Sequence, residues 1–594
     1  MQTLYSKRFE DVYHSRQNGL GETEHVFLKG NTLPDKWQKR ERFSICELGF
    51  GTGLNFMATA DLFEKTSSRN CRLHYISIEK YPLDIHTIRK VLNPLFGDKT
   101  RPLIRHYPLR IAGFHRIDFS GNINLTLVFD DVREALPELS GPIDCWYLDG
   151  FTPALNPEMW HEEIFSHMAS LSTPGTTFAT YTAAGHVRRN LVQAGFHVEK
   201  TKGYARKREM LQGFYEGPLR RVSTSRIKHP ESVAILGAGL AGTMTAHALK
   251  KRGINPLLID SSPCPPGGSS GNPSGMVNPR PFAQRGGQAE YFSTAFALAH
   301  RIYKNLAREH DIGFRACGAL HLCIDDKKAV RFGKALKNMG WHCETMRLVS
   351  AGTASELAGI DLKNMAMWFP DAFMLSPQKL VTTLLGNHGN HRFGHNITQI
   401  LKKGGIWRLI DDTGKTVTEA SVIILSNALD AARLYPGLSS DSLQPLAGHI
   451  TFLKNGGPFE KLKSNIIYGG HVCPPVNGFA QLGASFYRHT KTVPTPFSME
   501  NVYRFENFFG KKINPALVSH HWSSYRVTTP DRLPCIGPDE EREGLFICTG
   551  FGSHGLMGAA LGGEVIADYL TEDSGTTSLS LLNLVKPNRY RCKG

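Results

Sequence analysis

Short apolar segments alternate with longer amphipathic ones along the first part of the chain. The short segments predict buried strands at Phe43–Leu48, Leu73–Ile78, Leu125–Phe129, Ile143–Leu148 and Thr176–Tyr181. The amphipathic segments predict helices at Leu54–Glu64 and His186–Ala194. Because strands that alternate with helices usually form a doubly wound, mainly parallel sheet, we predict an α/β fold for this part.

A second series of the same kind begins farther along the chain. Its predicted elements are the strand Val233–Leu236, the helix Ala241–Arg252, the strand Pro256–Ile259, and, near the end, the strand Leu545–Cys548 and the helix Leu556–Leu570. The stretch from Gly217 to Pro230 is polar, basic and bounded by proline, which is typical of a linker. We therefore predict a first domain at residues 1–220, a linker at 221–231 and a second domain at 232–594.

The composition excludes several classes of protein. A chain of 594 residues with 41% hydrophobic and 21% charged residues is neither disordered nor a membrane bundle. No stretch approaches 18 uncharged apolar residues, and the first residues carry both signs of charge, so we expect neither a membrane span nor export. Eleven scattered cysteines without a Cys-x-x-Cys pair indicate reduced thiols, a cytoplasmic location and no structural metal. Two histidines near Asn387–His391 are expected to be solvated rather than metal ligands. We expect a monomer.

The net charge adds a candidate partner. The chain carries 69 Lys and Arg against 53 Asp and Glu, a net charge of +16 that is shared by both predicted domains. Such an excess favours a polyanion such as RNA, although it also serves solubility. Four cations, Lys202, Arg206, Lys207 and Arg208, surround Tyr204 and suit phosphate contacts with a base stacked nearby. A solvated basic loop fits the same pattern.

A glycine loop joins the first predicted strand to the first predicted helix. It has the pattern acidic-x-Gly-x-Gly-x-Gly, formed by Glu47, Gly49, Gly51 and Gly53. Alternate glycines let the backbone approach a ligand closely, and the helix start supplies free N–H groups. The spacing fits the S-adenosylmethionine loop of class I methyltransferases. Acids end the next two strands in support of this site: Glu79 is expected at the ribose hydroxyls and Asp131 at the adenine.

Asp149 ends the fourth predicted strand, where this fold presents the methyl group that is transferred. A carboxylate there can hold or deprotonate an attacking amine, which must be neutral to act as a nucleophile. We therefore expect Asp149 to be catalytic, the alternative being a turn residue before Gly150.

The second domain opens with a dinucleotide-binding pattern. Gly237, Gly239 and Gly242 form Gly-x-Gly-x-x-Gly directly after a strand, and Asp260 closes the following strand, where it would bind the adenosine ribose. FAD rather than NAD is indicated by two more polar glycine segments. They contribute Gly268, Ser269 and Ser270 after the acid, and Gly552, Ser553 and Gly555 before the last helix. Arg526 is expected to grip a substrate carboxylate with two parallel hydrogen bonds.

Motifs along nearly the whole chain resemble the bifunctional tRNA 5-methylaminomethyl-2-thiouridine biosynthesis proteins of bacteria. The motifs are Asp11–Tyr13, Asn18–Leu20, Glu22-Thr23, Gly49–Asn55, Leu148–Phe151, Lys207–Met210, the flavin loop, Gly268–Asn272 and Lys586–Arg589. Each motif is weak alone, but their co-occurrence and order are specific to the family.

The resemblance implies a class I methyltransferase domain followed by an FAD domain of the glycine or D-amino-acid oxidase type with an inserted α+β substrate region. It also implies the chemistry. The FAD domain would oxidise the carboxymethylaminomethyl group of the tRNA wobble uridine, releasing glyoxylate, and the first domain would methylate the exposed amine with S-adenosylmethionine. Arg526 matches the substrate-carboxylate arginine of the amine oxidases. Asp130 stands where glycine is expected, which leaves open whether Asp130 or Asp131 contacts adenine.

Two other functions fit parts of the sequence. An amine oxidase fused to a small-molecule methyltransferase would need no RNA, but the shared basic excess argues against it. A non-catalytic RNA-binding scaffold is disfavoured by the intact glycines and strand-end acids of both sites.

Overall fold

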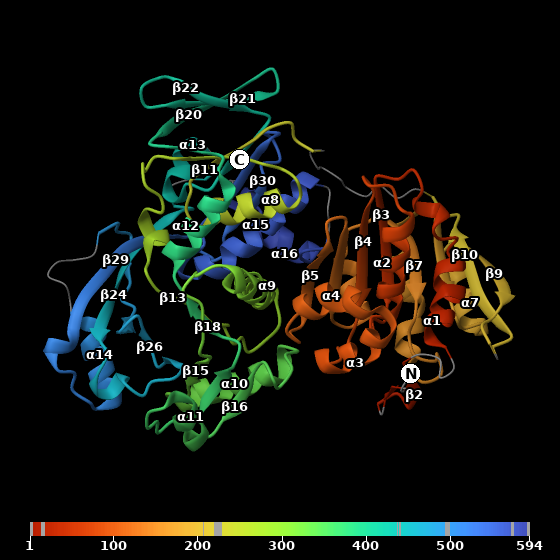
Figure 1. The fold of residues 1–594 in the computed structure, drawn as a ribbon, viewed down its shortest axis with the longest axis horizontal. Coiled ribbons are helices and arrows are strands. Elements are labelled where there is room, and N and C mark those ends of the chain that lie inside the picture. Colours follow the sequence, from red (N-terminus) through yellow and green to blue (C-terminus); the bar gives the residue numbers. More distant parts are fainter. Residues whose placement is uncertain are drawn as a thin grey trace. The chain divides into compact units, whose positions relative to one another are not determined.

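The chain forms two compact units, each with its own sheets (Figure 1). The computed structural model describes all residues except 1–3, 7, 14–17, 206, 219–228, 436, 439–440, 493–498, 572–574 and 591–594, so most of the expected linker and Arg206 lie outside the described residues. The first unit comprises Met1–Ser225 with Asp573–Ser580, and the second comprises Arg226–Glu572 with Leu581–Gly594. Among the helices described, none has the length and apolar character that crossing a membrane requires.

The first unit is built on an eight-stranded sheet of order β5-β6-β4-β3-β7-β8-β10-β9. Its parallel strands are β3 (Arg42–Leu48), β4 (Arg72–Ile78), β6 (Ile123–Phe129), β7 (Ile143–Leu148) and β8 (Ser172–Thr180). These five strands confirm the strands predicted from the apolar segments. The sheet continues antiparallel at its edges with β5 (Gly113–Ser120), β9 (Phe196–Lys202) and β10 (Glu209–Tyr215), which the apolar pattern did not predict.

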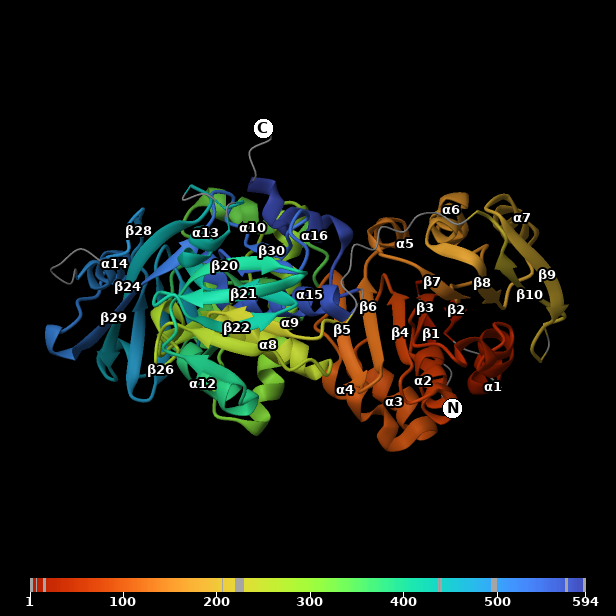
Figure 2. The ribbon, with the colours of Figure 1, turned by 90° about the horizontal axis from the view of Figure 1, so that it is seen from above.

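Helices cover both faces of this sheet, with α2 (Leu54–Thr66) and α3 (Ile85–Phe96) on one face and α6 (Glu162–Ser170) and α7 (Gly185–Gln193) on the other (Figure 2). Alternate residues of a strand point to opposite faces. Along β3, Ile45 therefore packs with the α2 side, whereas Cys46 packs with the α6 side. Both faces are buried, which explains why most residues of the strand are apolar, Ser44 and Glu47 being buried polar exceptions.

A short segment from late in the sequence completes the first unit. Thr576, Thr577 and Ser578 are buried, and a side chain on Gly575 would collide with Thr126 of β6. Ser580 donates to Glu138 from its backbone nitrogen at 2.8 Å and from its hydroxyl at 2.6 Å.

The second unit contains a six-stranded sheet of order β19-β12-β11-β23-β31-β30. Its strands are β11 (Val233–Leu236), β12 (Leu257–Asp260), β19 (His391–Phe393), β23 (Val422–Leu425), β30 (Cys535–Pro538) and β31 (Leu545–Thr549). Two helices, α8 (Leu240–Lys251) and α15 (Gly555–Thr571), pack tightly together, because a Cβ on Gly563 would lie 2.7 Å from the Met244 carbonyl oxygen. The elements predicted at both ends of this domain are confirmed.

A nine-stranded sheet lies in the same unit and was not predicted. Its strands are β15 (Ala319–Leu322), β16 (Arg347–Val349), β17 (Ala366–Phe369), β24 (Gln444–Lys454), β25 (Asn465–Ile467), β26 (His471–Val476), β27 (Phe479–Gly483), β28 (Tyr487–Arg488) and β29 (Val518–Thr528). Smaller sheets are formed by β13 (Gly275–Val277), β14 (Arg315–Ala316) and β18 (Phe373–Leu375), and by β20 (Ile397–Lys403), β21 (Ile406–Asp411) and β22 (Thr416–Ala420). Further helices are α9 (Gly287–Glu309), α10 (Asp326–Asn338), α11 (Ala351–Ala358), α12 (Pro377–His388) and α14 (Glu500–Phe509).

One expectation about histidines is corrected. His388 ends α12 and is buried, and its Nε2 lies 2.7 Å from the Pro256 carbonyl oxygen, so it is not a solvated loop residue. Within the described parts of the chain, no group of three or more His, Cys, Asp or Glu side chains is arranged to hold a metal ion.

Candidate functional sites of the two units

The glycine loop of the first unit adopts a backbone that requires glycine. Gly49, Gly51 and Gly53 have φ angles of 104°, 51° and 79°, which L side chains rarely adopt. A Cβ on Gly49 would lie 2.3 Å from the carbonyl oxygen of Asp149, so the loop packs directly on the end of β7. This packing aims the start of α2 into a cavity at the carboxyl edge of the sheet.

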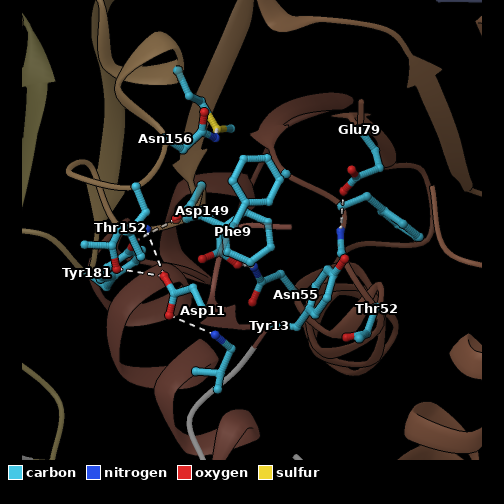
Figure 3. Close-up of a pocket in the computed structure, with 18 of the residues that line it drawn as sticks. Phe9, Asp11, Tyr13, Thr52, Asn55, Glu79, Asp149, Thr152, Asn156 and Tyr181 are labelled. Atoms are coloured by element: carbon cyan, nitrogen blue, oxygen red, sulfur yellow. Dashed lines mark hydrogen bonds between the residues drawn. The ribbon is translucent and has the colours of Figure 1, made fainter. Parts of the chain in front are cut away.

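The cavity has a volume of about 890 Å³ and is lined by the loops that follow β3, β4, β6 and β7 (Figure 3). Glu79 is part of the cavity lining. Its carboxylate accepts hydrogen bonds from the backbone N–H groups of Gly51 at 2.9 Å and Tyr81 at 2.8 Å and so connects the loops after β3 and β4. Burial raises the pKa of Glu79, and these two hydrogen bonds oppose that effect. Each oxygen has a second lone pair, which leaves acceptor capacity for a ribose diol.

A buried amide connects the carboxyl groups of Glu47 and Asp149 at the centre of the site. Asn55, on the first turn of α2, donates from Nδ2 to Glu47 Oε1 at 2.9 Å and to Asp149 Oδ2 at 2.7 Å. The hydroxyl of Thr23 donates to Asn55 Oδ1 at 2.7 Å, and this bond fixes which side of the amide faces the acids. Ser77 donates to the other oxygen of Glu47 at 2.6 Å.

Both acids have pKa values near neutrality. Burial raises the pKa of Glu47 to about 8, with the hydrogen bond from Ser77 opposing the shift. Burial and the nearby charge of Glu22 raise the pKa of Asp149 to about 7, against the opposing effects of Asn55 and Lys207. A carboxylate that titrates near neutral pH is suited to exchange a proton with an amine.

The expected RNA-binding cations have different surroundings. The Lys207 Nζ lies 3.9 Å from the Tyr181 ring centroid and 3.0 Å from Glu22 Oε1, on the lining of the cavity. Lys202 ends β9, and both Lys202 and Arg208 are exposed. Lys207 therefore lies at the cavity rather than on a separate basic surface.

Asp130 and Asp131 both line the cavity, but Asp131 already has cationic partners. Its carboxylate accepts from Lys80 at 2.7 Å and from the Arg133 guanidinium at 3.2 Å, and it caps α5 (Val132–Ala135). Burial opposes ionisation of Asp131, but the hydrogen bonds from Arg133 and Lys80 outweigh it and lower its pKa. An adenine amino group would have to compete with these cations for Asp131.

In the second unit, the predicted flavin loop is packed so closely that its three glycines leave no room for a Cβ atom. Gly237 has a φ of 99°, and a Cβ there would lie 2.6 Å from the Ser426 carbonyl oxygen. A Cβ on Gly242 would lie 1.8 Å from the Gly237 carbonyl oxygen, and one on Gly239 would lie 2.9 Å from Ser270 Oγ. Asp260 accepts from the Ala238 backbone N–H at 2.7 Å and so lies beside the loop. A loop without side chains at a helix start fits the pyrophosphate of FAD.

The second glycine segment bridges this loop and β29. Its turn, Gly268–Gly271, places Ser270 Oγ 3.0 Å from the Leu240 N–H at the start of α8, and Ser269 donates to the carbonyl oxygen of Tyr525. Arg526 follows on β29. These contacts connect the dinucleotide loop to β29 at Tyr525, the residue before Arg526.

Arg526 has a buried guanidinium nitrogen in this site. Its Nη1 is buried and makes no hydrogen bond to any described residue, and burial lowers its pKa to about 10. An isolated β-bridge between Thr528 and Phe551 ties β29 to the segment that begins α15, which contains Gly552, Ser553 and Gly555. His554 in that segment is held neutral, because burial, with Arg280 and Arg526 nearby, lowers its pKa to about 3.

Several residues of these sites were missed by the sequence analysis. Asn55 and Thr23 occur in motifs that carried the resemblance, but the pattern gave them no role. Tyr181 and His554 carried no recognisable local signal, because their relevance depends on contacts between distant segments.

Comparisons with known proteins agree with the two sites. Residues 95–216 match the family described as S-adenosyl-L-methionine-dependent methyltransferase, and residues 232–569 match the family of FAD dependent oxidoreductases. Solved structures that resemble the second unit include glycine oxidase from Geobacillus kaustophilus (TM-score 0.50, 21% identity, covering 58% of this chain and 94% of that one). L-proline dehydrogenase from P. horikoshii is also similar (TM-score 0.51, 19% identity, covering 61% and 98%). At these identities the likeness concerns the fold.

The chain is therefore a bifunctional enzyme in which an S-adenosylmethionine-dependent methyltransferase precedes an FAD-dependent oxidoreductase, and the predicted fold class and cofactors are confirmed. Curated relatives named tRNA 5-methylaminomethyl-2-thiouridine biosynthesis bifunctional protein match it along its length. The relative from Nitrosospira multiformis is 34% identical, covering 99% of this chain and 97% of its own, and that from Stutzerimonas stutzeri is 32% identical, covering 98% and 95%. The chain belongs to this family.

Proposed function

We propose that this enzyme modifies the wobble uridine of tRNA in two successive steps. The second unit removes the carboxymethyl group from 5-carboxymethylaminomethyl-(2-thio)uridine, and the first unit methylates the resulting 5-aminomethyl group. The observation that carries this proposal is the buried, unpartnered Nη1 of Arg526 beside the flavin loop, in a chain whose full-length relatives are named for this pathway. A tRNA substrate places the reaction in the cytoplasm.

Arg526 binds the carboxylate that the substrate carries before the first step. The guanidinium would complete its hydrogen bonds on that group and orient the adjacent C–N bond toward the cofactor. FAD, when bound, supplies a two-electron acceptor for oxidation of this bond. Water then adds to the substrate imine, and glyoxylate leaves. The neutral His554 adds no positive charge to those of Arg280 and Arg526.

Asp149 prepares the amine for the second step. An alkylammonium must lose a proton before it can attack a methyl group, and Asp149, with a pKa of about 7, can accept it or hold the amine by a hydrogen bond. S-adenosylmethionine supplies the methyl group. We propose that Gly49, Gly51 and Gly53 admit this donor, that Glu79 binds its ribose, and that Asp130 or Asp131 faces its adenine.

The decisive experiment is nucleoside mass analysis of under-modified tRNA after incubation with the enzyme. Without S-adenosylmethionine we expect the aminomethyl nucleoside and one glyoxylate per nucleoside, and with it the methylaminomethyl nucleoside. Efficient glyoxylate release from free N-substituted glycines, with no change in tRNA, would instead support the small-molecule amine oxidase.

A further inference from the structure

Among the described residues, Phe486 is an exposed aromatic side chain that borders Arg526. Phe486 is 51% exposed, although most phenylalanines of the second unit are buried, and its ring centroid lies 5.4 Å from the Arg526 guanidinium carbon. The residue belongs to the segment between β27 and β28, and β28 pairs with β24 through Tyr487 and Ala447. Figure 2 shows β24, β28 and β29 together in this sheet.

A glycine makes the contact between Phe486 and Arg526 possible. Arg526 pairs with Leu446 of β24, on the opposite side of that strand from β28. Its guanidinium reaches across Gly448, where a Cβ would lie 2.9 Å from Arg526 Nη1 and 2.3 Å from the Ser485 carbonyl oxygen. The geometry thus places an exposed aromatic face directly beside the group that is proposed to hold the carboxylate.

The same segment is basic. Arg488 and Lys491 are exposed, and neither forms an ion pair with a described residue. The Lys491 Nζ lies 5.9 Å from the ring centroid of Tyr525, the neighbour of Arg526. Exposed cations in the same short segment as an exposed aromatic ring suit a nucleic acid, because the ring stacks on a base while the cations neutralise phosphates. They do not suit an apolar protein surface, which would leave the cations desolvated and unpaired.

We propose that Phe486, Arg488 and Lys491 form a nucleotide platform at which the oxidoreductase unit binds the anticodon loop. Phe486 stacks on a base at the modified position, and Arg488 and Lys491 contact the neighbouring phosphates. The platform rests on the proposed function of this unit and explains how a site of the amino-acid-oxidase fold takes its substrate from RNA. A small amino acid satisfies Arg526 but leaves the exposed part of the Phe486 ring uncovered.

The test measures glyoxylate release from carboxymethylaminomethyl-tRNA by the FAD-loaded, full-length enzyme. Phe486→Ala is expected to raise KM for tRNA on the order of tenfold with little change in kcat, because stacking on an aromatic side chain contributes to binding by roughly that factor per base. Phe486→Trp should restore KM. Leu401→Ala, which removes a similarly exposed apolar side chain from β20, is the matched control and should behave like the unsubstituted enzyme.

Binding of an anticodon stem–loop oligonucleotide is measured in parallel by fluorescence anisotropy, since it reports on the platform even without turnover. The double variant Arg488→Ala/Lys491→Ala should bind more weakly and show a shallower dependence of affinity on salt concentration. Unchanged KM and affinity in Phe486→Ala would overturn the platform. A fall in kcat at constant KM would also overturn it, because that result would mean that Phe486 acts only through Arg526. Absence of glyoxylate from the unsubstituted enzyme would instead refute the proposed function, while the anisotropy still decides on the platform.

Discussion

Asn55 and Asp149 lie 94 positions apart in the sequence, yet the Asn55 Nδ2 is 2.7 Å from Asp149 Oδ2. The same nitrogen serves Glu47, so one amide sets the position of both acids of the methyltransferase site. The amide is oriented in turn by Thr23, which comes from the N-terminal segment rather than from the sheet. Thr23 contacts Asn55 but not Asp149, and through Asn55 it can influence the position of the Asp149 carboxylate.

Replacement of Asn55 should impair methyl transfer through Asp149. In Asn55→Leu, the hydrogen bond that opposes the raised pKa of Asp149 is lost, so the pH at which methylation reaches half its maximum should move upward. We expect a several-fold loss of kcat at pH 7 that is partly recovered at pH 8.5. Thr23→Val should show a weaker effect in the same direction. A uniform loss at every pH would indicate only that the fold has been damaged.

The methylation rate should depend on the ionisation of Asp149 itself. Because its pKa is raised to about 7, methylation should fall as the pH is lowered through about 7, where the carboxylate becomes protonated. Asp149→Ala should lower turnover by roughly 10²–10⁴-fold and remove this limb of the profile, with little change in donor affinity. Single-turnover methylation of aminomethyl-tRNA measures both effects. Loss of donor affinity with a normal residual rate would show that Asp149 is structural.

Gly51→Val should abolish S-adenosylmethionine binding. The residue has a φ of 51°, and a Cβ there would lie 3.2 Å from the Tyr13 ring, at the wall of the cavity. Isothermal titration calorimetry measures donor affinity. Gly175→Val is the matched control, because Gly175 also has a positive φ but has open space around it. Both variants should retain FAD, and normal donor affinity in Gly51→Val would contradict the placement of the donor.

Arg526→Ala should separate the two activities. Loss of a charge-assisted bidentate contact in a desolvated site costs on the order of 2–5 kcal/mol, so glyoxylate release from carboxymethylaminomethyl-tRNA should nearly stop. Methylation of aminomethyl-tRNA should continue at the normal rate, since that substrate lacks the carboxylate. Arg526→Lys keeps the charge without the bidentate geometry and should be intermediate. Normal glyoxylate release by FAD-loaded Arg526→Ala would transfer the role to another cation, Arg532 being the next candidate.

The parts of the fold that could be predicted are those with local signals. Strands buried on both faces are mainly apolar, as in β3, or wholly apolar, as in β11, and the loops that follow them need glycine for reasons of backbone geometry. The nine-stranded sheet was harder to predict, because many of its strands are short and its order joins strands that lie far apart in the sequence, such as β15 and β25. Arg526 was assigned from its motif, but its pairing with Leu446, 80 positions earlier, follows only from the fold.

The same limit applies within the methyltransferase site. The glycines and strand-end acids were recognisable because each stands at a fixed offset from a strand. The bridge from Thr23 through Asn55 to Asp149 joins three elements, and neither its polar residues nor their spacing distinguishes it from ordinary helix and loop positions. The sequence could not predict which of Asp130 and Asp131 faces the adenine, because the contact of Asp131 with Lys80 joins the loops after β4 and β6 and follows only from the fold.

The assignment of Asp573–Ser580 to the first unit has a consequence for biosynthesis. Ribosomes deliver the methyltransferase sheet before the second unit, but the residues that cover Thr126 and bind Glu138 are made after residues 226–572. The N-terminal unit thus begins to fold first but is completed only after residues 226–572 of the second unit have been made. Separating the two activities by cutting the gene near codon 226 would leave the methyltransferase without its final segment, whereas a fragment that carries residues 573–580 on a short connection would restore it.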